Sequence, residues 1–72
     1  MEIMKNTQFE ATECNNANDA LEMSAALGCD AIMLDGRFFA IEPNQATKLA
    51  QSGESFAFLC DDNNTIITIP VN

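Results

Sequence analysis

The clearest pattern in the chain is two pairs of apolar segments, each pair joined by a short polar turn. The first pair runs from Ala31 to Ile41 around Asp35-Gly36, and the second from Phe56 to Val71 around the acidic and amide residues 61–64. Asp-Gly between apolar runs is a strong hairpin signal, because a type I′ turn needs positive φ at both of its central residues. Both pairs are therefore predicted to be β-hairpins, with strands at Ala31–Asp35, Arg37–Ile41, Phe56–Cys60 and Thr65–Val71.

Both predicted hairpins are apolar on both faces. Successive side chains of a strand point to opposite faces, so each hairpin presents two sets of residues. The first hairpin has Ile32, Leu34, Phe39 and Ile41 on one face and Ala31, Met33, Phe38 and Ala40 on the other. The second has Phe56, Phe58, Cys60, Ile67, Ile69 and Val71 on one face and Ala57, Leu59, Ile66, Thr68 and Pro70 on the other.

Two helices are predicted from their capping residues and their apolar spacing. The first, Ala17–Leu27, follows candidate asparagine N-caps and ends at Gly28, and the second runs from Pro43 to Ser52, before Gly53. Helical periodicity gives inward stripes of Ala17, Ala20, Leu21, Ser24 and Leu27 in the first helix, and of Ala46, Leu49 and Ala50 in the second. Residues from Thr7 to Glu13 alternate between apolar and polar, which is typical of an edge strand with one buried face.

These elements predict one α+β domain over residues 1–72, in which residues 1–6 are loosely ordered. The order β-α-β-β-α-β-β predicts an antiparallel sheet with both helices packed on one face. Its first six elements match the connection order of ferredoxin-like domains, with one C-terminal strand added, and this topological likeness implies no function. The bulk of Ile32 and Phe39 favours their face of the first hairpin as the one beneath the helices. A weak internal repeat, which aligns Gly28 with Gly53, favours the face of Met33 and Phe38 instead, because the face of Phe56 and Phe58 is expected beneath the helices in the second hairpin.

If two short helices cover only one face of the sheet, the other face needs a partner. A chain of 72 residues also buries only about 60% of its unfolded surface, so further apolar burial would stabilise it. We therefore expect a small, non-enzymatic interaction module, with a homodimer as the first choice because stacking two copies hides both apolar faces. The candidate contacts are Met33, Phe38, Leu59 and Ile66, with Ile32 and Phe39 as the alternative set for the first hairpin. Arg37, next to the turn, is expected to extend to the sheet edge or to pair with a surface carboxylate, and at an interface it would act as an anchor.

The charge of the chain changes the range of partners. Eleven Asp and Glu residues against three Lys and Arg give a formal net charge of −8, which argues against direct binding to nucleic acid or to an anionic membrane. A solubilising role is the simpler interpretation of this charge. The alternative function is a phage-type inhibitory protein whose acidic surface mimics nucleic acid and blocks the basic groove of a nuclease or defence complex. Its candidate residues are Glu10, Glu13, Asp19, Glu22, Asp61 and Asp62.

Candidate chemistry is sparse. The chain has no histidine, and its three cysteines, Cys14, Cys29 and Cys60, have few basic residues to lower a thiol pKa. Residues 61–65 offer oxygen ligands but lack the spacing of a calcium loop, so no metal site, cofactor or catalytic residue is predicted. Small-molecule binding between the sheet and the helices ranks last, because converging polar groups are missing. Residues 1–8 contain no long apolar stretch, which predicts a cytoplasmic protein with reduced thiols.

Overall fold

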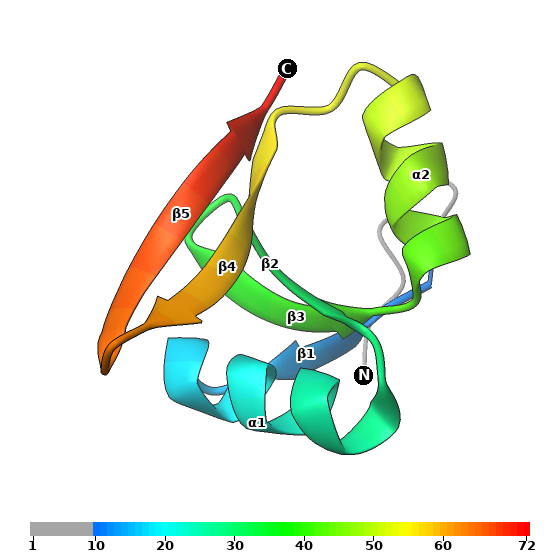
Figure 1. Ribbon diagram of the computed structural model, residues 1–72. Coiled ribbons are helices and arrows are strands. Elements are labelled where there is room, and N and C mark those ends of the chain that lie inside the picture. The colour runs from blue at the N-terminus through cyan, green and yellow to red at the C-terminus, as the bar shows by residue number, and fades with distance from the viewer. Residues whose placement is uncertain (1–9) are drawn as a thin grey trace.

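The computed structural model describes residues 10–72, and these form two helices and one antiparallel sheet (Figure 1). The elements are β1 (Thr12–Cys14), α1 (Ala17–Leu27), β2 (Asp30–Leu34), β3 (Arg37–Ile41), α2 (Pro43–Gln51), β4 (Phe56–Asp62) and β5 (Thr65–Val71). The five strands lie in the order β1-β3-β2-β4-β5. The predicted α+β class and the element order are confirmed. The expected loose order of residues 1–6, and residues 7–9 of the strand predicted over residues 7–13, fall outside the described residues. Glu10 and Ala11 precede β1, which starts later than predicted and extends to Cys14.

Local chemistry sets both ends of α1 and the first hairpin turn where the sequence predicts them, whereas β4 continues to Asp62, two residues beyond its predicted end. The Asn16 side chain accepts a hydrogen bond of 2.8 Å from the backbone N–H of Asp19, which caps the first turn of α1. Gly28 ends that helix in the left-handed conformation with φ of 70°. The two hairpin turns also have positive φ at their central residues, which are Asp35 and Gly36 in one turn and Asn63 and Asn64 in the other. Both are therefore two-residue turns that match the twist of the strands they join.

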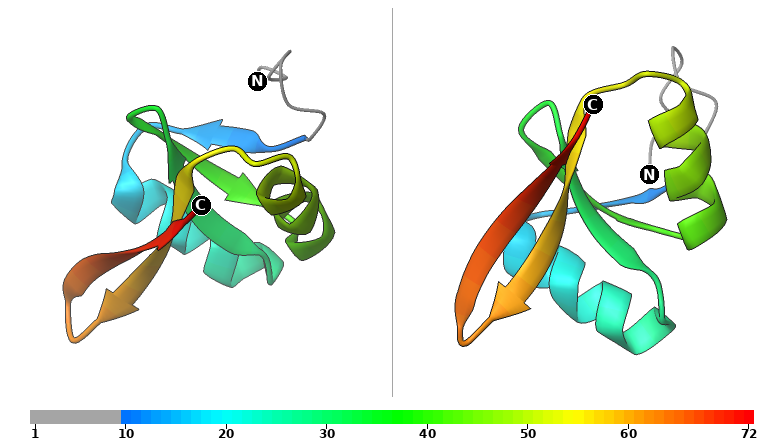
Figure 2. Two further views of the ribbon diagram at one scale, coloured as in Figure 1. Left: turned by 90° about the horizontal axis from the view of Figure 1, so that it is seen from above. Right: turned by 45° about the horizontal axis from the view of Figure 1, so that its top comes forward.

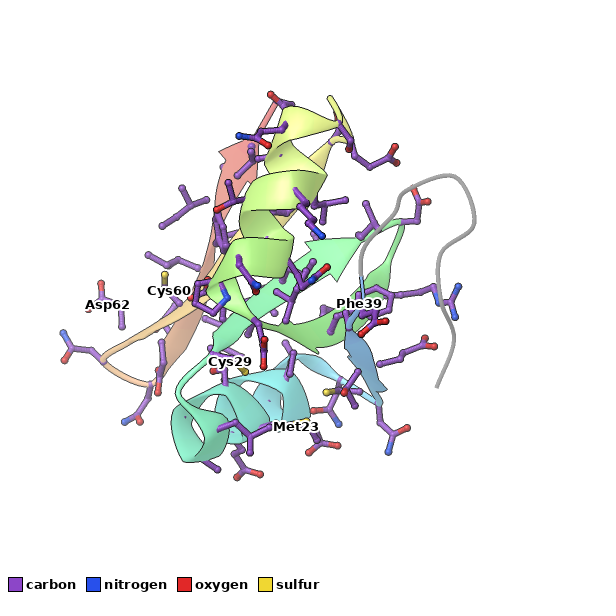
Figure 3. All side chains as sticks on the ribbon, turned by 90° about the vertical axis from the view of Figure 1, so that its right-hand side faces the viewer. Met23, Cys29, Phe39, Cys60 and Asp62 are labelled. Carbon is purple, nitrogen blue, oxygen red and sulfur yellow. The ribbon has the colours of Figure 1, made fainter. Side chains whose placement is uncertain are left out.

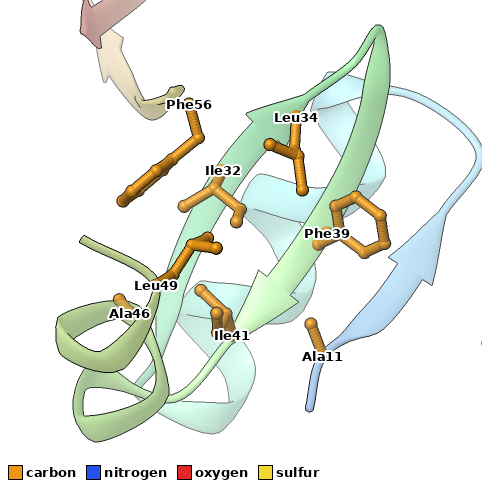
Figure 4. Close-up of a cluster of buried hydrophobic side chains, with 8 residues drawn as sticks. All are labelled: Ala11, Ile32, Leu34, Phe39, Ile41, Ala46, Leu49 and Phe56. Carbon is orange, nitrogen blue, oxygen red and sulfur yellow. The ribbon is translucent and has the colours of Figure 1, made fainter. Parts of the chain in front are cut away.

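The two helices lie on opposite faces of the sheet, so the prediction that both pack on one face is wrong (Figures 1 and 2). Beneath α2, Ala46 and Leu49 pack against the sheet residues Ile32, Leu34, Phe39, Ile41 and Phe56, and against Ala11, which precedes β1 (Figure 4). Beneath α1, Ala20 packs against Ala31 and Leu59, with Met33 and Phe38 beside them. Each apolar face of the first hairpin thus has a helix of its own.

The position of β4 accounts for this arrangement. The connection through α1 passes over β3 to reach β2, and the connection through α2 passes over β2 to reach β4, so both move across the sheet in the same direction. The strands from which they leave, β1 and β3, run antiparallel to each other. Both crossovers are right-handed, which is the kind that proteins favour. Because the two crossovers share this handedness, their helices must lie on opposite faces of the sheet. Had β4 returned to lie beside β1, the same handedness would have put both helices on one face.

The β4–β5 hairpin extends beyond the two helices, and β5 forms the outer edge of the sheet (Figures 1 and 2). Every residue of β5 from Thr65 to Pro70 is exposed, and Val71 is half-buried. At the other end of the molecule Leu27 is 70% exposed, although its helical position predicts burial. This prediction is wrong because the last turn of α1 lies at the rim of two surface hollows, both lined by Leu27.

Candidate interaction surface

The four predicted contact residues, which are Met33, Phe38, Leu59 and Ile66, do not share an open face of the sheet. Leu59 is only 6% exposed and belongs to the cluster beneath α1, and Met33 and Phe38 are half-buried against that cluster. Their expected place on a helix-free face is wrong, because α1 covers it. The alternative set, Ile32 and Phe39, is buried in the core beneath α2.

Arg37 lies at the start of β3 and joins that strand to β1. Its Nε donates a hydrogen bond of 2.8 Å to Glu13 Oε2, and its Nη2 donates one of 2.6 Å to Glu13 Oε1. Its guanidinium carbon lies 5.8 Å from the centroid of the Phe39 ring. The hydrogen bonds and positive charge of Arg37 lower the pKa of the Glu13 carboxyl from its ordinary value. Arg37 therefore fastens the short edge strand β1, which is a structural role.

Ile66 is the member of the predicted set that the structure leaves exposed, and two neighbours accompany it. The exposed fractions are 36% for Ile66, 42% for Ile67 and 48% for Ile69. Ile66 lies on the α1 side of the sheet, as the register with Asp61 shows, and Ile67 and Ile69 lie on the α2 side with Cys60 and Phe58. Of this second face, Phe56, Phe58 and Val71 pack against the α2 core, which leaves Ile67 and Ile69 outside it.

The backbone of β5 also presents hydrogen-bonding groups at the sheet edge. Asp62 and Thr65 close the two-residue turn, so they form a hydrogen-bonded pair, and such pairs alternate along an antiparallel ladder. The odd-numbered residues of β5 therefore bond to β4, and the even-numbered residues turn their backbone groups outward. Ile66 and Thr68 each present an N–H and a C=O there, whereas Pro70 presents only a C=O. A proline with its nitrogen toward the open side is typical of an edge strand.

The six acidic candidates fall into three groups. Glu13, Asp19 and Glu22 line one surface hollow along α1, together with Cys14, Asn15, Met23, Ala26 and Leu27. Glu10 lines a second hollow near Glu42 and Cys29, between the end of α1 and the start of α2. Asp61 and Asp62 lie on the β4–β5 hairpin (Figure 3).

The three cysteines are half-buried, and each is a free thiol. Burial raises the pKa of the Cys14 and Cys29 thiols, and nearby carboxylates, such as Asp19 for Cys14 and Asp30 for Cys29, raise them further. Both thiols are therefore held in the protonated form, which is a poor nucleophile. Among residues 10–72, no group of three metal-ligating side chains is brought together.

Ile67 and Ile69 are candidate residues that were expected on a covered face. One signal pointed to their strand as an edge: Pro70 cannot donate a hydrogen bond to a neighbouring strand, so it marks a strand end or a sheet edge. Within the described part of the chain, no helix is both long enough and apolar enough to cross a membrane. Comparisons of the chain with protein-family models, with curated proteins and with solved structures find no match.

Proposed function

We propose that this protein is a non-enzymatic interaction module that binds another polypeptide by adding a strand to β5. The observation that carries the proposal is the exposed, uncharged edge of β5, where Ile66, Ile67 and Ile69 surround outward-facing backbone groups. In strand addition, main-chain hydrogen bonds supply affinity and the alternating side chains supply selectivity.

The contrast between the two edges of the sheet supports this choice. Proteins protect edge strands by keeping them short or by placing charges on them, because an open edge pairs readily with other chains. β1 has both protections, since it spans three residues and carries Glu13. β5 spans seven residues and carries no charge, with Pro70 as its one interruption. An edge left open in this way is expected where pairing is the function.

A proline substitution tests the edge without disturbing the hairpin. Thr68→Pro removes an outward N–H and leaves the groups that bond to β4 in place, as Pro70 already does two residues further along. Thr68→Val is the matched control, because it keeps the N–H and a β-branched side chain. We expect peptides selected from a displayed library on the wild-type protein to bind the Val variant and to lose affinity for the Pro variant.

Amide chemical shifts locate the bound peptides. We expect the largest changes at residues 66–69, with smaller changes across the ladder in β4. Peptides that shift the helices alone, or that bind the Thr68→Pro variant as well as the wild type, would contradict strand addition. Circular dichroism and the dispersion of the amide spectrum check that both variants are folded.

A second candidate function is the acidic inhibitor that imitates nucleic acid. It is favoured by the three carboxylates of Glu13, Asp19 and Glu22 around one hollow along α1. Attraction between such a surface and a basic groove weakens steeply as salt rises, whereas apolar strand pairing does not. A basic partner that duplex DNA displaces, and that Asp19→Asn with Glu22→Gln releases, would support this function in place of the first.

A further inference from the structure

We propose that the strand added to β5 is the β5 strand of a second copy, paired antiparallel about a two-fold axis beside Ile67. This inference rests on the proposed function, because it names the partner of the same edge. The result is a symmetric dimer in which the two five-stranded sheets form one continuous sheet. The backbone, the side chains and the charge of β5 each support it.

The backbone groups select the register. In the proposed register Ile66 lies opposite Thr68 of the second copy. Each of these two residues donates its backbone N–H to the other and accepts a hydrogen bond at its C=O. The two-fold axis repeats this pair, which gives four hydrogen bonds in all. A register centred on Thr68 also allows four hydrogen bonds, two between the Thr68 residues and two from the Ile66 N–H to the Pro70 C=O, but it sets each proline ring against an Ile66 carbonyl, in the space that an N–H would otherwise occupy. In the Ile67-centred register Pro70 falls opposite Asn64, which belongs to the turn. The proline therefore marks the end of the paired segment.

The side chains are compatible with the same register. Ile67 lies opposite Ile67 of the second copy, in a pair without mutual hydrogen bonds, where Cα atoms approach to about 4.5 Å. Ile69 lies opposite Thr65 on the same face, and Ile66 lies opposite Thr68 on the other face. The three isoleucines that are exposed in one copy thus all gain apolar contacts across the two-fold.

The distribution of charge makes β5 the surface at which two acidic copies repel each other least. Each copy carries a formal charge of −8, yet the segment from Thr65 to Val71 carries none. Antiparallel pairing also places the two hairpin ends, with Asp61 and Asp62, at opposite ends of the shared strand pair. Along the strands, Asp61 and Asp62 lie about 7 Å and about 14 Å from their counterparts at roughly 3.4 Å per residue, and three strand spacings of about 4.8 Å separate them across the sheet. The resulting distances of roughly 16 and 20 Å exceed a screening length of about 8 Å at physiological salt.

Association measured over a range of concentrations tests the proposal. We expect sedimentation equilibrium to show a monomer–dimer equilibrium that is unchanged or strengthened by added salt, because salt screens the repulsion between the copies. Thr68→Pro removes two of the four hydrogen bonds and should weaken dimerisation about tenfold or more. Thr68→Val should dimerise like the wild type.

Cysteine cross-linking tests the register independently of those variants. In a background with Cys14, Cys29 and Cys60 changed to serine, we expect Ile67→Cys to form an intermolecular disulfide readily with oxidised glutathione. Removal of Cys60 is essential, because it lies directly opposite Ile67 within the hairpin. Ile69→Cys faces Thr65 of the second copy rather than itself, so it should cross-link much more slowly.

The outcomes separate this inference from the proposed function. A wild-type protein that stays monomeric at millimolar concentration, while library peptides still bind along β5, would overturn self-pairing and leave strand addition in place. Equal cross-linking of Ile67→Cys and Ile69→Cys would overturn the register. A dimer that persists in Thr68→Pro with the wild-type affinity would show that the copies meet elsewhere.

Discussion

Arg37 was expected either to extend to the sheet edge or pair with a surface carboxylate, or to anchor a partner, and in the structure it pairs with Glu13. Its two hydrogen bonds to Glu13 connect β3 to β1 across an exposed part of the surface. Apolar neighbours in the sequence could not reveal which carboxylate it binds, because Glu13 lies 24 positions away. The partner of a charged side chain depends on strand pairing, which the order of residues does not display.

The Glu13–Arg37 pair predicts a dependence of stability on pH. The pKa of Glu13 is lower in the folded chain than its ordinary value near 4.5, so its contribution is present above that value. The contribution is lost as the pH falls through the lowered pKa. We expect Glu13→Gln to lower the free energy of unfolding at neutral pH and to have no effect in strong acid, as measured by urea titration.

Glu22→Gln is the matched control for that measurement. It also removes one carboxylate, from an exposed position of α1, and so reproduces the change in net charge without touching Arg37. Equal effects of the two substitutions at neutral pH would mean that overall charge, rather than the ion pair, determines the result.

At the scale of elements, local chemistry was enough to place α1. Its bounds, Ala17–Leu27, agree with the prediction because an asparagine cap and a left-handed glycine define the two ends. The register of the first hairpin is also as predicted, since Asp35-Gly36 forms the turn and Ile32 pairs with Phe39. Such features involve residues close together in the chain, so a pattern can specify them.

The cap of α1 makes a measurable contribution. We expect Asn16→Ala to lower the free energy of unfolding by about 1 kcal/mol, because the backbone N–H of Asp19 loses its acceptor. Asn16→Asp keeps an acceptor and should be near neutral. Urea unfolding followed by circular dichroism measures both, with Asn18→Ala as a control at an exposed position of the same helix. A loss as large for Asn18→Ala would contradict a specific role for the cap.

At the scale of the whole molecule, the opposite placement of the helices explains a conflict within the sequence. The bulk of Ile32 and Phe39 favoured one face of the first hairpin for helix packing, and the repeat favoured the face of Met33. Both indications were right, since α2 covers the first face and α1 the second. The inference of an uncovered sheet face followed from assigning both helices to one side.

Leu59 and Ile66 test this arrangement, because they share one face of the β4–β5 hairpin. Leu59→Lys places a charge beneath α1 and should cost more than about 3 kcal/mol of unfolding free energy. Ile66→Lys places a charge at the exposed edge, opposite Asp61, and should change the free energy of unfolding by less than about 1 kcal/mol. Thermal unfolding, at a protein concentration low enough to exclude dimers, compares the stability of the two variants. Similar losses of stability in both would contradict the conclusion that α1 covers Leu59.

The candidate site shows the same division between local and long-range information. Ile66 is exposed although it lies on the α1 side of the sheet, and hydrophobicity did not distinguish it from Leu59, Met33 and Phe38, which α1 covers. Ile67 and Ile69 were expected to be covered, and they are exposed because the core beneath α2 includes Phe56, Phe58 and Val71 but not the rest of that face. The length of α2 and its position relative to the β4–β5 hairpin decide which residues of that face are covered.

Patterns along the chain were enough to predict the elements, their order, the Asp35-Gly36 turn and the two apolar faces of each hairpin. These depend on backbone preferences at single residues and on side-chain alternation, which are properties of neighbouring positions. The position of β4 beside β2, which places the helices on opposite faces and leaves β5 as the open edge, follows instead from contacts between distant parts of the chain. A hairpin with two apolar faces has the same sequence pattern whichever helix covers each face. The assignment of helices to faces therefore depends on the path of the chain through space.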